Sequence, residues 1–196
     1  NSIIMAIQIN GNGTITGISV GGLPDGIVDT DMLANTVTTG KILQVKQTVK
    51  TDTWSSTAAS FTDISGMSLS ITPTSTSNKI LIDVTLNYGG TSNVYAALKV
   101  LRDSTTIVTS TAVAQGNQIN GSFAANTIQG SNSNYKVNTA AFKFLDSPSS
   151  TSALTYKVQV YVRDNQTFNI NRPNNNDNDN YIMGGTSSIT AMEVAA

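Results

Sequence analysis

The residues best suited to hold a ligand form an Asn/Asp run, Asn174-Asn-Asn-Asp-Asn-Asp-Asn180. Calcium takes roughly six to eight oxygen ligands, and alternating carboxylates and amides can supply several of them. The run lacks the glycine and the bidentate glutamate of an EF-hand loop, and asparagine is abundant throughout the chain. We therefore interpret the run as an exposed, solvated loop, with calcium binding as the alternative, and we predict no metal ion and no cofactor.

The composition excludes most catalytic chemistry. The 196 residues contain no histidine and no cysteine, which rules out a Ser-His-Asp triad, a cysteine nucleophile, disulfides and an ordinary zinc site. Glu193 is the only glutamate, so the usual paired-glutamate acid–base arrangement is missing. The glycine-rich segments match neither the Walker nor the Rossmann pattern. We predict a protein that is not an enzyme and has no catalytic residues, with a polysaccharide depolymerase as the enzymatic alternative.

Charge and hydropathy restrict the partners. A net charge of −1 gives no electrostatic attraction to nucleic acid, and no stretch approaches the ~18 apolar residues of a membrane span. Thr, Ser and Asn dominate a surface that is polar without being charged, which is typical of proteins that work outside cells. The first residues lack the basic segment and apolar run of an export signal. This combination predicts a virion protein that is assembled in the host cytoplasm and released by lysis.

Residues 1–40 differ from the rest of the chain. Ala6–Ile9 and Thr14–Thr16 flank two Asn-Gly pairs, a strong hairpin signal. A short repeat follows, in which residues 28–33 align with residues 37–42. So few large apolar groups cannot form a core of their own. We therefore predict an attachment and oligomerisation arm that contacts symmetry-related copies or the particle through Val28, Met32, Leu33, Val37 and Ile42.

Residues 41–196 are predicted to form an all-β head domain. Ile80–Tyr88 and Leu154–Val162 alternate apolar and polar residues, as half-buried strands do. Residues 94–101 and 106–113 flank a turn and are expected to form a hairpin. Further strands are expected at residues 67–71, 140–145, 168–171 and 188–194. Many short strands separated by turns indicate an antiparallel β-sandwich, jelly-roll-like in type, whose strand order the sequence does not reveal.

Aromatic residues divide into core and surface candidates. Tyr88 and Tyr156 share a strand face with aliphatic neighbours and are expected in the core, whereas Tyr161 lies on the opposite face of its strand. Tyrosine, asparagine and aspartate together suit glycan recognition as well as ordinary subunit contacts. We expect an exposed recognition loop formed by Tyr135, Asn176, Asp177, Asn178, Asp179 and Tyr181.

Three stretches give the chain a family resemblance. They are residues 17–33 (GISVGGLPDGIVDTDML) with their echo to Ile42, residues 61–82 (FTDISGMSLSITPTSTSNKILI) and residues 188–194 (SITAMEV). The chain resembles marine and cyanobacterial phage virion proteins of the tail-fibre-like, structural kind. The resemblance implies a short N-terminal attachment segment, a β-sandwich head and a homotrimer, and it supplies no binding residues that transfer by position.

The sequence therefore predicts a short homotrimeric fibre, appendage or decoration protein on a phage particle, with other virion proteins as partners and a host-surface glycan as a further candidate partner. Neither nucleic-acid binding nor membrane insertion is expected. The alternative is a bacterial surface adhesin or lectin-like glycan-binding module. The residues do not distinguish tail, baseplate and capsid locations.

Overall fold

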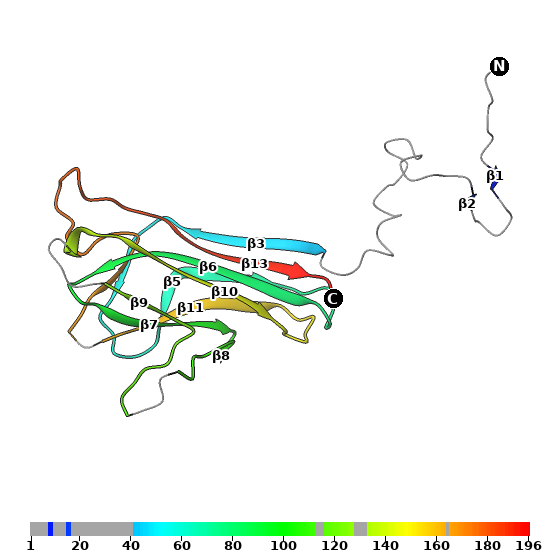
Figure 1. Ribbon diagram of the computed structural model, residues 1–196, viewed down its shortest axis with the longest axis horizontal. Helices are drawn as coiled ribbons and strands as arrows, with labels where there is room; N and C mark the ends of the chain where they lie inside the picture. The colour runs from blue at the N-terminus through cyan, green and yellow to red at the C-terminus, as the bar shows by residue number, and fades with distance from the viewer. Residues whose placement is uncertain (1–7, 10–14, 17–40, 113–115, 128–132, 164) are drawn as a thin grey trace, which may run out of the picture. The chain divides into compact units, whose positions relative to one another are not determined.

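The computed structural model describes residues 8–9, 15–16, 41–112, 116–127, 133–163 and 165–196 (Figure 1). The chain divides into two units, residues 1–38 and Thr39–Ala196. In the first unit β1 (Gln8–Ile9) pairs antiparallel with β2 (Ile15–Thr16), which confirms the hairpin expected around the Asn-Gly pairs. The apolar repeat lies outside the described residues except for its last member, Ile42.

The second unit is built from two antiparallel sheets (Figure 1). The six-stranded sheet contains β3 (Ile42–Lys50), β4 (Trp54–Ser56), β6 (Lys79–Gly90), β10 (Asn138–Asp146), β12 (Phe168–Ile170) and β13 (Ser187–Val194). The five-stranded sheet contains β5 (Thr62–Ile71), β7 (Tyr95–Arg102), β8 (Thr105–Thr106), β9 (Phe123–Asn126) and β11 (Leu154–Val162). One 3-10 turn, η1 (Ser133–Tyr135), and no α-helix occur among the described residues.

Several strands are interrupted, so that two short strands take the place of one long strand in each sheet. β12 and β13 both pair with β6, at its end and at its beginning respectively, so they lie end to end along it. β4 pairs with β12 and β3 with β13, while β8 and β9 both pair with β7. The sheets then run β3/β4–β13/β12–β6–β10 and β5–β11–β7–β9/β8. This is the jelly-roll order, so the predicted antiparallel, jelly-roll-like sandwich is confirmed.

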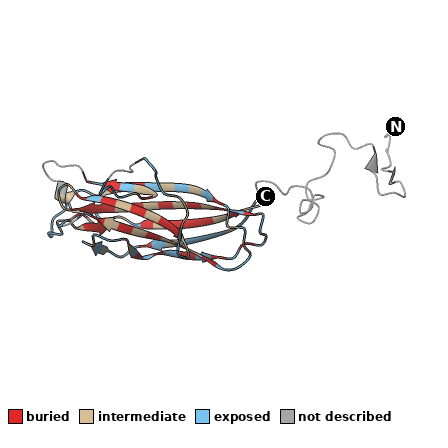
Figure 2. Ribbon diagram, turned by 90° about the horizontal axis from the view of Figure 1, so that it is seen from below, coloured by how far each residue is buried: buried red, intermediate tan, exposed pale blue. Residues whose placement is uncertain are grey.

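The core fills the space between the two sheets. Figure 2 shows buried residues alternating along the strands of both sheets. β6 contributes alternate residues from Ile80 to Tyr88, and β11 contributes alternate residues from Leu154 to Val162. The period of two that predicted these strands places one face of each against the opposite sheet. Tyr88 and Tyr156 are buried and Tyr161 faces outward, as the sequence pattern predicts.

The two open sides of the sandwich are closed differently. On one side β3 meets β5, where the Thr48 hydroxyl donates to the carbonyl oxygen of Ser68 at 2.9 Å. On the other side β9 meets β10, where the rings of Phe123 and Phe142 stack with centroids 5.4 Å apart. Hydrogen bonds on one side and aromatic contacts on the other therefore join the sheets.

The predicted strand over residues 106–113 is wrong for residues 107–112, and Val113 lies outside the described residues. β8 ends at Thr106, because β9 pairs with β7 from Tyr95 to Leu98 and occupies the positions that a longer β8 would need. The chain then bends away, and the Ser122 hydroxyl donates to the carbonyl oxygen of Val108 at 2.6 Å. β9 replaces the second half of the expected hairpin.

Candidate functional site

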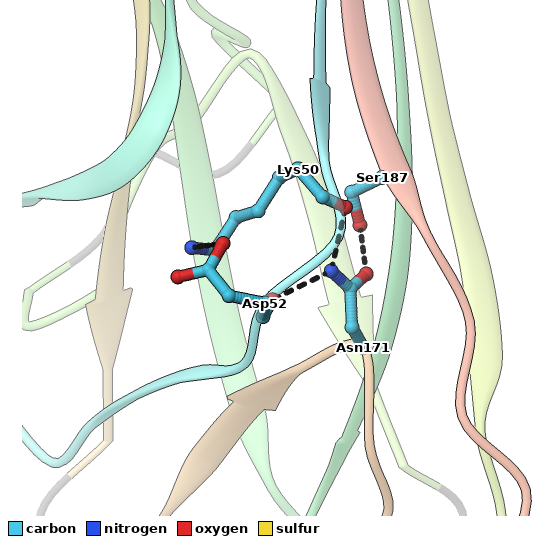
Figure 3. A network of polar contacts seen from close by, with 4 residues as sticks. All are labelled: Lys50, Asp52, Asn171 and Ser187. Carbon is cyan, nitrogen blue, oxygen red and sulfur yellow. Dashed lines mark hydrogen bonds and ion pairs between the residues drawn. The ribbon is translucent and has the colours of Figure 1, made fainter.

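The loop that carries the Asn/Asp run begins at a polar junction in the six-stranded sheet. The chain leaves the six-stranded sheet after β12 and returns to it at β13. Asn171 Nδ2 donates to the carbonyl oxygens of Lys50 and Asp52, both at 2.9 Å (Figure 3). Its Oδ1 accepts a hydrogen bond from Ser187 Oγ at 2.7 Å. The asparagine adopts a φ of 64°, a backbone conformation that Asn tolerates better than most residues, and it ties both interruptions of the sheet together.

A buried lysine lies beneath this junction. The Lys50 side chain is 1% exposed, and its Nζ forms a 2.8 Å ion pair with the exposed carboxylate of Asp52 (Figure 3). This hydrogen bond lowers the pKa of Asp52. The Lys50 stem passes Gly66 in β5, whose φ of 81° favours glycine at this position. The base of the loop is therefore held by hydrogen bonds and by an ion pair.

The Asn/Asp run is an exposed loop, as the sequence predicts. All residues from Asn176 to Asn180 are exposed. The backbone N–H of Asn175 donates to the carbonyl oxygen of Asn134 in η1 at 2.8 Å, and the Asn175 side chain donates to Asp177 Oδ2 at 2.7 Å. These contacts anchor the start of the run while its tip stays open to solvent.

Two tyrosines join η1 to this loop. The rings of Tyr135 and Tyr181 meet edge to face with centroids 5.2 Å apart. A hydrogen bond with Asp179 raises the pKa of Tyr181, which is 48% exposed. The structure thus brings together the six residues predicted for recognition: Tyr135, Asn176, Asp177, Asn178, Asp179 and Tyr181.

A hollow of about 550 Å³ borders the loop. It lies between the β3–β4 connection and the segment that leads into β13. Thr51, Thr53 and Met183 are among its lining residues. No group of three or more His, Cys, Asp or Glu side chains that could hold a metal ion occurs in the described part of the chain. The arrangement offers hydroxyl, amide and aromatic contacts, which suit recognition by hydrogen bonding and stacking.

The predicted contact residue Ile42 lies at the opposite end of the sandwich (Figure 1). It begins β3 and is 53% exposed. Val28, Met32, Leu33 and Val37 lie outside the described residues. No helix in the described segments is long and apolar enough to cross a membrane.

An exposed apolar row crosses the outer face of the six-stranded sheet near this end. Val45 lies opposite Met192, Met192 opposite Leu81, and Leu81 opposite Leu145. Val45 and Leu145, on the two outermost strands, are 54% and 46% exposed. The next row is polar, with an ion pair of 2.8 Å between Lys143 and Asp83. Sequence analysis did not single out this row, because a cross-strand row depends on the register of four strands.

Glu193 is a buried acid that sequence analysis considered only for catalysis. The residue is 0% exposed, and its carboxylate accepts hydrogen bonds from Gln44 Nε2, Thr74 N, Thr74 Oγ1 and Asn78 Nδ2, at 2.6, 2.6, 2.8 and 2.6 Å. Burial raises its pKa, but the hydrogen bonds outweigh burial and lower the pKa to about 2. The alternation of Ile189, Ala191 and Glu193 was the signal that this side chain points inward. Its role is structural, since it joins β13 to β3 and to the β5–β6 connection.

Comparisons with known proteins identify no family. No protein-family model and no curated protein matches the chain. Among solved structures, the chain is similar to the infectious bursal disease virus Gx strain structure, with 13% identity and a TM-score of 0.40 over 78% of this chain and 37% of that one. It is also similar to the VP2 subviral particle of infectious bursal disease virus, with 12% identity and a TM-score of 0.34 over 78% and 37%. The chain spans little more than a third of these proteins, and likeness at this level carries no conclusion about its function.

Proposed function

We propose that this chain is a non-enzymatic structural protein of a phage particle, forming a short homotrimeric fibre, appendage or decoration on the particle surface. Residues 1–40 attach the β-sandwich to the particle or to symmetry-related copies, through Val28, Met32, Leu33, Val37 and Ile42. The loop end of the sandwich then faces outward and is available for contact with a host surface.

The observation that carries the proposal is that the two ends of the sandwich differ. The chain enters it at Lys41, at the end where β3 begins and β13 ends, while η1 and the Asn/Asp loop occupy the other end (Figure 1). A module attached through its entering segment presents the opposite end to its surroundings. The exposed tyrosines and amides of that end are the groups that make contacts in recognition surfaces.

The apolar row supports self-association. A row of apolar side chains that crosses a solvent-exposed sheet face is a candidate contact with another molecule. Identical subunits that repeat one head-to-tail interface form a closed ring when the rotation between neighbours closes, and a trimer is one such ring.

Light scattering after size exclusion tests the assembly. We expect the full chain to have a mass near 62 kDa, about three times its 20.6 kDa. A variant carrying both Val45→Lys and Leu145→Lys should have a lower mass. Val49→Lys is the matched control, because Val49 is also on β3 and is 50% exposed but lies outside the row. A monomeric full chain would contradict the trimer, and an unchanged mass for the double variant would exclude the row from the interface.

Immunogold labelling of purified particles tests the virion role. We expect the full chain to label particles and a chain without residues 1–40 to be lost from them. Labelling of producing cells without labelling of particles would contradict the proposal and favour the surface adhesin. Retention of the shortened chain on particles would contradict the attachment role of the arm.

A further inference from the structure

A second hollow lies on the outer face of the five-stranded sheet, beside the connection between β8 and β9. Its volume is about 600 Å³, within the range of ligand pockets. Tyr161, Ala97 and Ala124 lie next to one another on β11, β7 and β9, so two small side chains form a floor beside a large one. Asn117 and Ile119 from the connection line another side.

Aromatic rings border this hollow and are held in place by neighbours. Tyr95 is 45% exposed, and the Arg163 guanidinium lies 5.4 Å from its ring centroid. Tyr161 packs against Phe61 with ring centroids 5.8 Å apart, and Lys99 Nζ lies 4.0 Å from the centroid of Phe61. Rings held by such contacts lose little conformational freedom when a flat apolar group stacks on them.

Polar groups whose hydrogen-bonding capacity is not fully used within the described residues lie beside the rings. Asn126 Oδ1 accepts from the Ala96 amide at 3.3 Å, while its Nδ2 donates to none of the described residues. The guanidinium of Arg163 forms no ion pair with the described part of the chain. Stacking surfaces next to amide and guanidinium donors suit a sugar, which has apolar C–H groups on the faces of its ring and hydroxyl groups around it.

A neighbouring hollow extends the site. Its volume is about 370 Å³, and it shares Ala97, Ile119 and Ala124 with the first. Asn120 lines it, and the Oδ1 atom of Asn120 is buried without a hydrogen-bond partner among the described residues. Buried acceptors are normally satisfied, and a turn of this side chain towards the hollow would let it accept a hydrogen bond from a ligand hydroxyl group.

We propose that these joined hollows bind an oligosaccharide, with one ring stacked near Tyr95 and Tyr161 and a further sugar unit near Asn120. Arg163 is the only cationic side chain among the described residues that line the larger hollow. This favours a sugar over a nucleic-acid strand, which would need a series of basic groups along its path. The site goes beyond the proposed virion role and does not depend on it, because every contact comes from the β-sandwich itself. It is also distinct from the Asn/Asp loop.

A glycan array probed with the full chain tests the proposal. The array should carry di- to tetrasaccharides of hexoses, deoxyhexoses, N-acetylhexosamines and uronic acids, and we expect selective binding to one group of them. The best-bound sugar is then titrated against Tyr95→Ala and Ala124→Phe, which remove a stacking ring and fill the floor. Both should weaken binding at least about tenfold. Ala141→Phe is the matched control, because Ala141 is also exposed on the outer face of a strand but belongs to the six-stranded sheet.

Each outcome decides the proposal. Loss of binding in the two site variants, with the control unchanged, supports it. Absence of binding to every sugar on the array overturns it. Equal affinity of all variants overturns it as well. Tyr181→Ala is measured alongside them, and a loss of binding in this variant alone would assign sugar binding to the Asn/Asp loop instead. Competition by the oligonucleotide dT10 at low salt, removed at high salt, would show a nucleic-acid surface. The virion role is tested separately by particle labelling, so the two proposals can fail independently.

Discussion

Replacing Glu193 by glutamine should make the protein less stable and less sensitive to acid. The carboxylate is fully buried and accepts four hydrogen bonds, all from neutral donors. Glutamine has nearly the same shape but only one accepting oxygen, and its amide hydrogens face donors. Glutamine therefore keeps the packing but loses the charge and some of the hydrogen bonds. Because only the carboxylate titrates, the pH dependence of the difference between the two proteins isolates its ionisation.

The magnitude follows from the lowered pKa. A fall from 4.5 to about 2 corresponds to a stabilisation on the order of 3 kcal/mol when the carboxylate is ionised in both the folded and the unfolded state. Because the folded pKa is the lower one, this stability is fully present above the unfolded pKa near 4.5. It is lost as the pH falls from there through the folded pKa near 2. At pH 3 about 2 kcal/mol of it should be gone.

Urea unfolding of the full chain and of Glu193→Gln, at pH 7 and at pH 3, measures this effect. Trp54, the single tryptophan, packs against the core and provides a fluorescence signal. The difference in unfolding free energy between the two proteins should shrink by about 2 kcal/mol at pH 3. Acid effects of the aspartates occur in both proteins and cancel. Asp83→Asn removes a surface charge and should cost less than about 1 kcal/mol at pH 7. A difference of equal size at both pH values would refute the reasoning.

Three further substitutions test the packing. Asn171→Ala removes the hydrogen bonds to the carbonyl oxygens of Lys50 and Asp52 and places alanine at positive φ, so it should lower the unfolding free energy by about 2–4 kcal/mol in urea titrations. Tyr156→Phe removes a 2.6 Å hydrogen bond to the buried carboxylate of Asp146 and should cost about 1–2 kcal/mol. Gly90→Ala would place a Cβ in steric clash with the carbonyl oxygen of Thr167, and thermal unfolding should show a loss of about 2 kcal/mol or more.

Each of these expectations has a contrary result. An Asn171→Ala protein as stable as the parent would mean that the junction in Figure 3 does not hold the sheet interruption. Full stability after Tyr156→Phe would mean that Arg102, 2.6 Å from the same carboxylate, is sufficient alone. An unchanged melting temperature for Gly90→Ala would show that the backbone there shifts freely.

The sequence predicted the strands whose alternation places apolar residues in the core. The nine residues from Ile80 to Tyr88 and the strand Leu154–Val162 are examples, because each has one consistently apolar face. β3 was not singled out, since Val45 and Val49 point to solvent while Lys50 is buried. An edge strand with polar groups inside and apolar groups outside reverses the pattern that identifies a half-buried strand.

The candidate site could be predicted only in part. The composition of the Asn/Asp run indicated an exposed loop, and the contact between Tyr135 and Tyr181 brings its predicted members together. The junction at Asn171 and the hollow beside Tyr95 were not predicted. Both depend on which strands become neighbours, and strand order is a long-range property that local patterns do not contain.

Neutral amides and hydroxyls carry much of the polar interior of this protein, and this has a measurable consequence. Only four ion pairs occur among the described residues, whereas Glu193 and Asn171 are held by neutral groups. Salt screens pairs of exposed charges and has little effect on buried hydrogen bonds. The unfolding free energy in urea at pH 7 should therefore change by less than about 1 kcal/mol between 0.05 and 1 M NaCl. A loss of more than about 2 kcal/mol of unfolding free energy would show that the ion pairs contribute more to stability than exposed pairs usually do. The variant Lys143→Gln would then measure how much of this contribution comes from the pair between Lys143 and Asp83.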